Sequence, residues 1–279
     1  MTIGILLALL AAVGYGTSDF IGGFGSGRVS AWAVAFTGQL AGAAAIVGVS
    51  LAMPGAPSLR DFGWAALAGV GGAIGSAFLY RGLASGSMGT AAPISAVGAA
   101  ILPVLVGSAL GERPTSLVWL GVLVALPGIW LVARESGADP AASRRPAMID
   151  GGIAGLGFGC LFVATAQIPS SAGVLPLAAS QLIGAVVIAA IATALRQPWR
   201  CGVRHLHWGV VAGALGAVGT CLYLAATQAT DLGVAAVLTS LFPAITVLLA
   251  VVILKERIRP TQRLGLAACG AAVVLVAIG

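Results

Sequence analysis

Charged residues are scarce in this chain. They make up only 8% of its 279 residues, whereas 59% are hydrophobic, and the mean hydropathy is +1.07. A water-soluble protein of this length has too little interior to hide so many apolar side chains. The composition therefore excludes a water-soluble globular protein and indicates a membrane protein.

Cysteine and histidine are also rare, which excludes two kinds of site. The four cysteines show no CxxC spacing, so they form neither a disulfide framework nor a zinc site. They are Cys160, Cys201, Cys221 and Cys269. The two histidines, His205 and His207, are two residues apart and cannot share a helix face. We expect no metal and no cofactor.

Catalytic signatures are missing. The sequence contains no HExxH, no GxSxG and no P-loop. Its apolar segments hold one deep acid, Asp19, and no histidine, so a nucleophile with a base is not available there. An ATP-driven pump would need a nucleotide-binding domain, for which there is no room. We therefore expect that the protein is not an enzyme.

Long apolar runs fill the chain, and a helix needs about 20 apolar residues to cross a bilayer. The predicted spans are residues 3–24, 30–52, 62–84, 88–110, 116–133, 148–168, 172–195, 207–229, 232–254 and 262–279. The first span lacks a preceding basic residue and is long, so we interpret it as structural rather than as a signal peptide. The fold class predicted is an all-α integral membrane protein with ten transmembrane helices.

The sequence contains an internal repeat. Residues 64–113 reappear without a gap at 208–257, with Trp64 on Trp208 and Glu112 on Glu256. Five spans per copy is an odd number, so the second copy must enter the membrane from the opposite side. We predict two inverted five-helix repeats, residues 1–133 and 148–279, joined by a linker at 134–147. Inverted repeats are typical of transporters with a binding site between the halves.

The basic residues lie at the ends of the predicted spans. The pI of about 9.8 would suit nucleic acid, but these residues do not gather on one soluble face, so no nucleic-acid partner is expected. Of the 14 basic residues, only Arg60 and Arg113 follow even-numbered spans. The positive-inside rule then places the odd-numbered loops in the cytoplasm and both termini outside.

Polar side chains inside spans are costly unless they face a cavity or another helix. The eighth span carries Thr220, Tyr223 and Thr227 on one helix face, and the third carries Ser76 and Tyr80. A Gln-Leu-x-Gly motif occurs in both copies, at Gln39 and Gln181, and the sixth span presents Phe158, Phe162 and Thr165. Each of these residues either lines a central cavity or joins helices. We expect Tyr80, Tyr223, Gln39 and Gln181 to face one shared space.

Two further features leave alternatives open. Pro243 follows Thr239 and Ser240, so the loosened backbone there either faces a cavity or forms a buried kink. Asp19 lies at a depth similar to that of Arg81. It either has a structural role, as an ion pair with Arg81 or a simple helix-end charge, or it binds a proton or a substrate amine during transport.

Short motifs resemble those of the drug/metabolite transporter superfamily, in its EamA branch. They are Tyr15-Gly16-Thr17-Ser18-Asp19-Phe20, Leu110-Gly111-Glu112-Arg113, Leu254-Lys255-Glu256-Arg257 and the segment from Ser240 to Thr246. The resemblance covers nearly the whole chain. It implies export of small metabolites, often amino acids, and adds Tyr15, Ser18 and Asp19 to the candidate cavity residues. Thr239 is a further candidate, because its hydroxyl lies one turn before Pro243. It also favours termini in the cytoplasm, opposite to the charge distribution.

These observations predict a secondary exporter of small metabolites, foremost aromatic or apolar amino acids, that works by alternating access. Its partners would be a small-molecule substrate and membrane lipid, and it would be a multi-pass, monomeric protein of a bacterial-type inner membrane. The alternatives are nucleotide-sugar exchange, which needs basic residues in the cavity, and a non-transporting scaffold. Uptake of labelled compounds into liposomes separates transport from the other classes.

Overall fold

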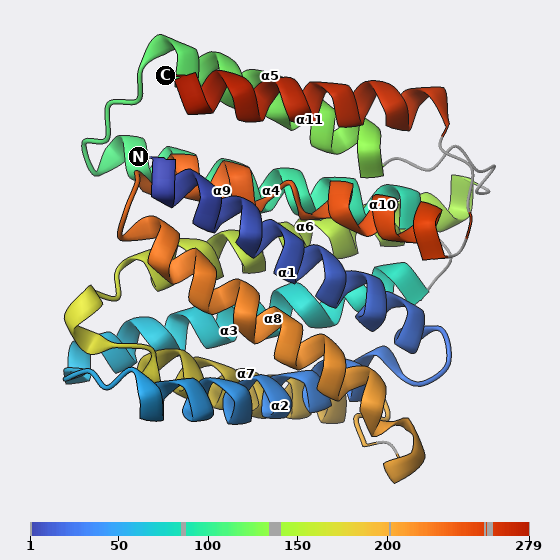
Figure 1. The fold of residues 1–279 in the computed structure, drawn as a ribbon. Helices are drawn as coiled ribbons and strands as arrows, with labels where there is room; N and C mark the ends of the chain where they lie inside the picture. The colour runs from blue at the N-terminus through green and yellow to red at the C-terminus, as the bar shows by residue number, and fades with distance from the viewer. Residues whose placement is uncertain are drawn as a thin grey trace.

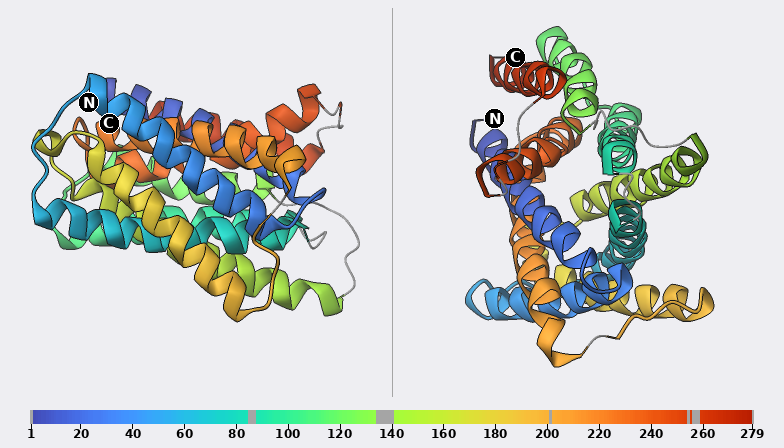
Figure 2. Two further views of the ribbon diagram at one scale, coloured as in Figure 1. Left: turned by 90° about the horizontal axis from the view of Figure 1, so that it is seen from below. Right: turned by 90° about the vertical axis from the view of Figure 1, so that its right-hand side faces the viewer.

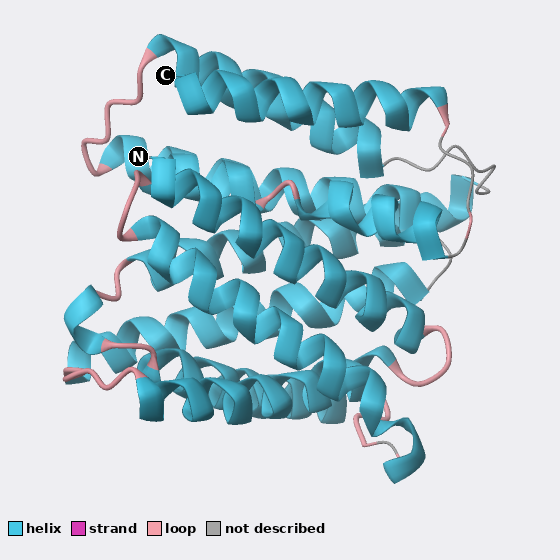
Figure 3. Ribbon diagram, in the orientation of Figure 1, coloured by secondary structure: helices cyan, strands magenta, loops and turns pink. Residues whose placement is uncertain are grey.

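The computed structural model describes residues 2–84, 88–133, 141–200, 202–253, 255 and 259–278, and the regular elements in these ranges are all helical (Figure 3). The long helices are α1 (Thr2–Ser26), α2 (Ala31–Ala52), α3 (Leu59–Ala84), α4 (Met88–Ala109), α5 (Ser116–Ala133), α6 (Ala141–Ala166), α7 (Leu175–Ala194), α8 (Leu206–Thr227), α10 (Phe242–Ile253) and α11 (Pro260–Ile278). Three short elements complete the described chain: η1 (Ser170–Ala172), η2 (Val203–His205) and α9 (Leu232–Thr239).

The helices lie side by side in one bundle, with both termini at the same end (Figure 1). Among the described residues, seven helical segments are long and apolar enough to cross a membrane, and residues 94–109, 116–132 and 260–276 form shorter apolar helices. The helix α1 starts at the end that holds the termini, whereas α6 starts at the opposite end (Figure 1). The chain is therefore an all-α membrane protein built as two inverted five-helix repeats, as the odd number of spans per copy predicts.

The packing of the helices repeats when the two halves are exchanged. Helix α1 packs on α8, and its counterpart α6 packs on α3 in the same way. Helices α2 and α7 pack on each other, as do α5 and α11, and these two pairs lie at opposite edges of the bundle (Figure 2). The two halves thus each contribute one helix to the pair α1–α8 and one to the pair α3–α6. We call these two pairs the α1–α8 unit and the α3–α6 unit, and they form the centre of the bundle.

Glycine pairs hold these two units together. A Cβ added to Gly14 of α1 would lie 3.0 Å from Gly219 Cα on α8. A Cβ added to Gly157 of α6 would lie 2.6 Å from the backbone nitrogen of Gly75 on α3. Because Gly75 and Gly219 are repeat equivalents, the same backbone-to-backbone contact occurs once in each unit. Such small faces allow close helix packing where no hydrophobic effect drives association.

Two predicted boundaries differ from the structure. The helix α6 begins at Ala141, so the second part of the expected linker 134–147 is helical, with Pro146 inside the helix. The ninth span is one apolar segment, Leu232–Ile253, but it is divided into α9 and α10. The division falls at Ser240 and Leu241, just before Pro243, which lacks the N–H that would continue the ladder.

The division between α9 and α10 is buried among helices. Thr239 and Ser240 are fully buried, and the hydroxyl of Thr239 donates a 3.3 Å hydrogen bond to the carbonyl of Ala8. On the other side of the break, the hydroxyl of Thr246 donates to the carbonyl of Gly16 at 3.0 Å. Of the two readings for this proline, the buried kink describes the structure.

Candidate functional site

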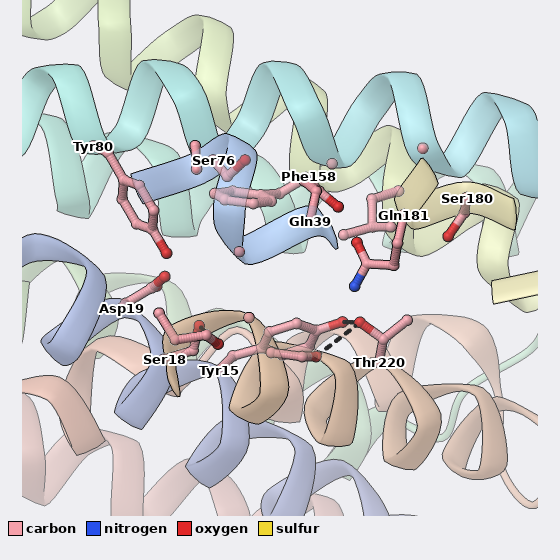
Figure 4. A pocket seen from close by; sticks show the side chains of 18 of the residues that line it. Tyr15, Ser18, Asp19, Gln39, Ser76, Tyr80, Phe158, Ser180, Gln181 and Thr220 are labelled. Carbon is pink, nitrogen blue, oxygen red and sulfur yellow. Dashed lines mark hydrogen bonds between the residues drawn. The ribbon is translucent and has the colours of Figure 1, made fainter. Parts of the chain in front are cut away.

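A cavity of about 90 Å³ lies between the α1–α8 unit and the α3–α6 unit, with α2 and α7 completing its wall (Figure 4). Its polar lining consists of Tyr15, Ser18, Asp19, Gln39, Ser76, Tyr80, Ser180, Gln181 and Thr220. The remaining lining residues are Val34, Ala35, Gly38, Ala68, Gly69, Gly72, Phe158, Leu161, Ala212, Gly213 and Gly216. Both halves of the chain therefore build one central cavity.

The Gln-Leu-x-Gly motif explains the meeting of α2 and α7. A Cβ on Gly184 of α7 would lie 2.9 Å from the Cδ of Gln39, which comes from α2. Reciprocally, a Cβ on Gly42 of α2 would lie 2.7 Å from the Nε2 of Gln181, which comes from α7. Each glutamine thus occupies the space that the glycine of the other motif leaves free. The Oε1 of Gln39 is buried and has no hydrogen-bond partner among the described residues.

An aromatic ring from each half lies over an equivalent glycine. A Cβ on Gly219 would lie 3.1 Å from the Cγ of Tyr15, and a Cβ on Gly75 would lie 2.5 Å from the Cδ1 of Phe158. The hydroxyl of Tyr15 donates a 2.9 Å hydrogen bond to Oγ1 of Thr220, which in turn donates to the carbonyl of Gly216. The two rings therefore have fixed positions in the cavity wall.

Most of the lining follows the approximate twofold symmetry of the fold. Eight pairs of repeat-equivalent residues line the cavity together: Tyr15 with Phe158, Ser18 with Leu161, Gly38 with Ser180, Gln39 with Gln181, Ala68 with Ala212, Gly69 with Gly213, Gly72 with Gly216, and Ser76 with Thr220. The symmetry axis thus passes through the cavity. Chemistry differs between partners, because Ser18 and Tyr15 carry hydroxyls where Leu161 and Phe158 carry none.

Asp19 is the only charged residue of this lining. It comes from α1, and its carboxylate faces the hydroxyl of Tyr80 on α3 (Figure 4). Within the described part of the chain, no hydrogen bond or ion pair engages this carboxylate directly. The half-buried acid is therefore available to a ligand.

The expected ion pair between Asp19 and Arg81 is absent, and this prediction is wrong. Arg81 instead binds Asp150 of α6, with its Nε 3.0 Å from Oδ2 and a second contact from NH2 to Oδ1. Successive residues of a helix point about 100° apart, so Arg81 faces α6 whereas its neighbour Tyr80 faces the cavity. The guanidinium also lies 4.4 Å from the centroid of the Phe78 ring.

Five candidate residues lie away from this cavity: Phe162, Thr165, Tyr223, Thr227 and Thr239. Tyr223 was expected to share the cavity with Tyr80, but it is fully buried and donates a 3.1 Å hydrogen bond to the carbonyl of Phe162. Its ring lies 4.5 Å from that of Phe162. Of the three polar candidates on α8, only Thr220 reaches the cavity, beside Ala212, Gly213 and Gly216 of the same helix.

Thr165 is also fully buried, and its hydroxyl has no hydrogen-bond partner among the described residues. Thr227, near the end of α8, donates a 2.8 Å hydrogen bond to the carbonyl of Leu224. Both residues lie beyond the cavity, towards the end of the bundle that holds the termini.

The sequence prediction missed Ser180 and the glycine and alanine part of the lining. Ser180 directly precedes Gln181, and its hydroxyl donates 2.7 Å to the carbonyl of Leu177. The small residues gave no polar signal. The internal repeat did point to them, because Ala68-Gly69 and Ala212-Gly213 are identical in both copies, and all four residues line the cavity.

The cavity combines one acid, two amides, several hydroxyls and two faces of aromatic rings, without a basic residue in its lining. Such a surface suits a small ligand that carries a positive group and hydrogen-bonding groups. Over the described residues, no cluster of three histidine, cysteine or acidic side chains is placed to hold a metal ion.

Comparison with known proteins supports the same architecture. One solved structure, titled "Crystal structure of protein", superposes with a TM-score of 0.73 at 21% sequence identity, covering 99% of this chain and 96% of that one. No curated protein matches the sequence. The model of the EamA-like transporter family matches twice, at residues 2–134 and 148–278, which are the two halves related by inversion. With both repeats matched over nearly its whole length, the chain belongs to the EamA-like transporter family.

Proposed function

We propose that this transporter exports small metabolites, foremost amino acids with apolar or aromatic side chains, as a secondary transporter that uses alternating access. The observation that carries the proposal is the cavity itself, which lies on the twofold axis between the α1–α8 and α3–α6 units. A site at the interface of inverted repeats is where transporters bind their substrates.

The chemistry of the lining supports an amino acid. The carboxylate of Asp19 would receive the substrate ammonium, and the amides of Gln39 and Gln181 would donate to the substrate carboxylate. The rings of Tyr15 and Phe158 offer apolar surface for the side chain. These three kinds of group line the same cavity, so a zwitterion bound there can contact all of them at once.

The same lining argues against the two alternatives. A nucleotide sugar carries phosphates, and the cavity holds an acid and no basic residue to receive them. A non-transporting scaffold gives no reason for polar residues from both halves to surround a central space.

In this proposal, the basic residues of the loops set the orientation of the protein in the membrane. Arg28, Arg196, Arg200 and Arg204 lie at the end of the bundle opposite the termini. By the positive-inside rule this end lies in the cytoplasm and the termini lie outside. We further propose that the protein works as a monomer in a bacterial-type inner membrane.

The test is uptake by liposomes that contain the purified protein. Labelled amino acids, polyamines and nucleotide sugars are compared, each with and without a pH gradient. We expect saturable uptake of an apolar or aromatic amino acid. Saturable uptake of a nucleotide sugar alone would refute the proposed substrate class, and uptake of nothing would support the scaffold.

The variant Gln181→Ala should weaken amino-acid uptake by raising KM, because one amide donor to the carboxylate is lost. Val186→Ala is the matched control on the same helix, since Val186 is exposed on the outer surface of α7. Equal KM values for the two variants would contradict the role given to Gln181.

A further inference from the structure

The cavity departs from twofold symmetry at one end. Four lining residues have no equivalent residue in the lining: Asp19, Val34, Ala35 and Tyr80. Asp19 and Tyr80 lie near the ends of α1 and α3, and Val34 and Ala35 lie near the start of α2. All three positions are at the end of the bundle opposite the termini (Figure 1). The cavity therefore extends from the axis towards this end, which we name the basic end after its arginine-rich loops.

At the end of the bundle that holds the termini, packed side chains at the repeat-equivalent positions close the cavity. These positions hold Phe162 in place of Asp19, Pro176 and Leu177 in place of Val34 and Ala35, and Leu224 in place of Tyr80. None of these four residues lines the cavity, and all four are buried. Burial alone does not separate the two ends, because Val34, Ala35 and Tyr80 are 2%, 3% and 5% exposed. The difference is that the cavity reaches these three residues and does not reach their equivalents. The hydrogen bond from Tyr223 to Phe162 joins the α1–α8 unit to the α3–α6 unit there.

A second contact ties the same closed end. The loop after α4 places Glu112 at the start of α9, where its Oε1 accepts from the N–H of Leu232 at 2.6 Å and its Oε2 from that of Gly233 at 3.1 Å. A carboxylate at a helix N-terminus satisfies free N–H groups and interacts favourably with the helix dipole. Glu112 belongs to the first half and α9 to the second, so this contact also bridges the two halves.

In the opposite-facing state, the two inverted halves exchange conformations, so that each half takes the arrangement that the other half has in this structure. In that state Asp19 occupies an environment like that of Phe162 now, and Tyr80 one like that of Leu224. A charged carboxylate without a cation is strongly disfavoured in such a closed, apolar place. Phe162 has no such restriction. The two ends of the cavity are thus chemically unequal, and only the end with Asp19 needs a positive charge before it closes.

We propose that Asp19 is the coupling site of the transport cycle. The basic end closes only after a positive charge has neutralised Asp19, and that charge is supplied by a proton or by a primary ammonium group of the substrate. This inference rests on the proposed transport function and adds the step that drives the change of state. It assigns to the Asp19–Tyr80 end of the cavity a monovalent cationic ligand.

Few other ionisable groups surround Asp19. The hydroxyl of Tyr80 of α3 faces it, and Tyr15 of its own helix lines the same cavity (Figure 4). Arg81 is held by Asp150, and Arg28 lies over the ring of Phe24. Helices α2, α9 and α10, which also pack against α1, carry no ionisable side chain, and α8 contributes only His207, Cys221 and Tyr223. Glu112, which ties the closed end through α9, is the other carboxylate involved in this step. The neutral variants of Asp19 below separate a pH response of Asp19 from one of Glu112.

The experiment measures which end of the cavity is open. Ala35 and Leu177 are repeat equivalents at the open and the closed end, so each is replaced by cysteine, Ala35→Cys and Leu177→Cys, in separate proteins. Labelling by a membrane-impermeant maleimide is followed in liposomes, with the parent protein as background for its own cysteines. The pH is lowered from about 8 to about 5, across the range in which a perturbed carboxyl titrates.

If a proton supplies the charge, labelling of Ala35→Cys falls and that of Leu177→Cys rises at low pH without substrate. If the ammonium supplies it, an apolar amino acid causes the same shift at fixed pH, whereas its N-acetyl derivative does not. With Asp19→Asn or Asp19→Ser, the response to either is lost. Asp231→Asn, which removes an exposed carboxylate outside the cavity, keeps the response of the parent.

The proposal is overturned if neither pH nor the amino acid changes the labelling of the parent, or if a folded neutral variant of Asp19 responds like the parent. The parent arms need no Asp19 variant, so a folding failure of Asp19→Asn does not remove the test. A pH response without uptake of any amino acid would retain the coupling site and refute the proposed substrate. Uptake of an amino acid without any change in labelling would retain the proposed substrate and refute the coupling site.

Discussion

Single residues decide how closely the helices approach. Gly157 and Gly75 bring the backbones of α6 and α3 into contact, whereas Gly152, also on α6, has no neighbouring atom within 4 Å of where its Cβ would lie. The same residue type therefore serves packing at one position and is replaceable five residues away. The glycine-rich composition is a packing feature only where a partner backbone is present.

Gly157→Ala should lower stability, because its Cβ would lie 2.6 Å from a backbone nitrogen that cannot rotate away. The expected loss is about 1–3 kcal/mol, as for other overpacked sites. Thermal unfolding in detergent measures it, with Gly152→Ala as the control. Equal melting temperatures for the two variants would mean that the α3–α6 contact is looser than described.

The ion pair of Arg81 with Asp150 gives a second residue-scale prediction. Asp150 is largely buried, so Arg81→Ala leaves its carboxylate without a cation and should destabilise the fold more than the double variant Arg81→Ala/Asp150→Ala. A double-mutant cycle on thermal unfolding measures the coupling. Strictly additive effects would argue against the pair.

At the scale of elements, the Leu-Gly-Glu-Arg motif acts as a cap supplied by another helix. Gly111 has a φ of +98°, a conformation that suits glycine, and the N–H of Glu112 donates 3.0 Å to the carbonyl of Gly107. This turn brings the Glu112 carboxylate to the N-terminus of α9, where Asp231 makes no side-chain cap.

Glu112→Ala should therefore destabilise the protein by about 0.5–2 kcal/mol, the usual effect of losing a cap. It should also raise labelling at Leu177→Cys, because a contact that bridges the closed end is lost. Arg113→Ala is the control, since Arg113 is the exposed neighbour of Glu112. An increase in labelling with Arg113→Ala alone would refute the role of Glu112.

Elements with a strong local signal were predictable from sequence. The helices follow from apolar length, and inversion follows from an odd number of spans in an exact repeat. The break between α9 and α10 was visible as Pro243, but whether it faced a cavity depended on neighbouring helices. The partner of Arg81 was missed for the same reason, because depth along a helix does not reveal which face meets which neighbour. Tyr223 was misplaced because the cavity ends at Thr220 on α8, whereas the polar helix face continues for another two turns to Tyr223 and Thr227.

At the scale of the molecule, the units that enclose the cavity do not coincide with the two halves of the sequence. Glycine contacts join α1 to α8 and α3 to α6, so each unit combines both halves. The cavity lies between these units. At its closed end, the hydrogen bond of Tyr223 with Phe162 crosses from one unit to the other, and the contact of Glu112 with α9 crosses from one half of the sequence to the other. Alternating access then requires these contacts to break while the glycine contacts persist.

The central claim is that this cavity is the path of the substrate, and filling it tests the claim most directly. Gly72 lines the cavity, and a Cβ there meets only the flexible side chain of Leu161 at 3.5 Å or more, so Gly72→Phe should fill the space without unfolding the protein. Gly63→Phe is the control on the same helix, since nothing lies within 4 Å of its Cβ position. In liposomes, we expect Gly72→Phe to abolish uptake and Gly63→Phe to retain it. A folded Gly72→Phe protein that transports at the rate of the parent would contradict the account.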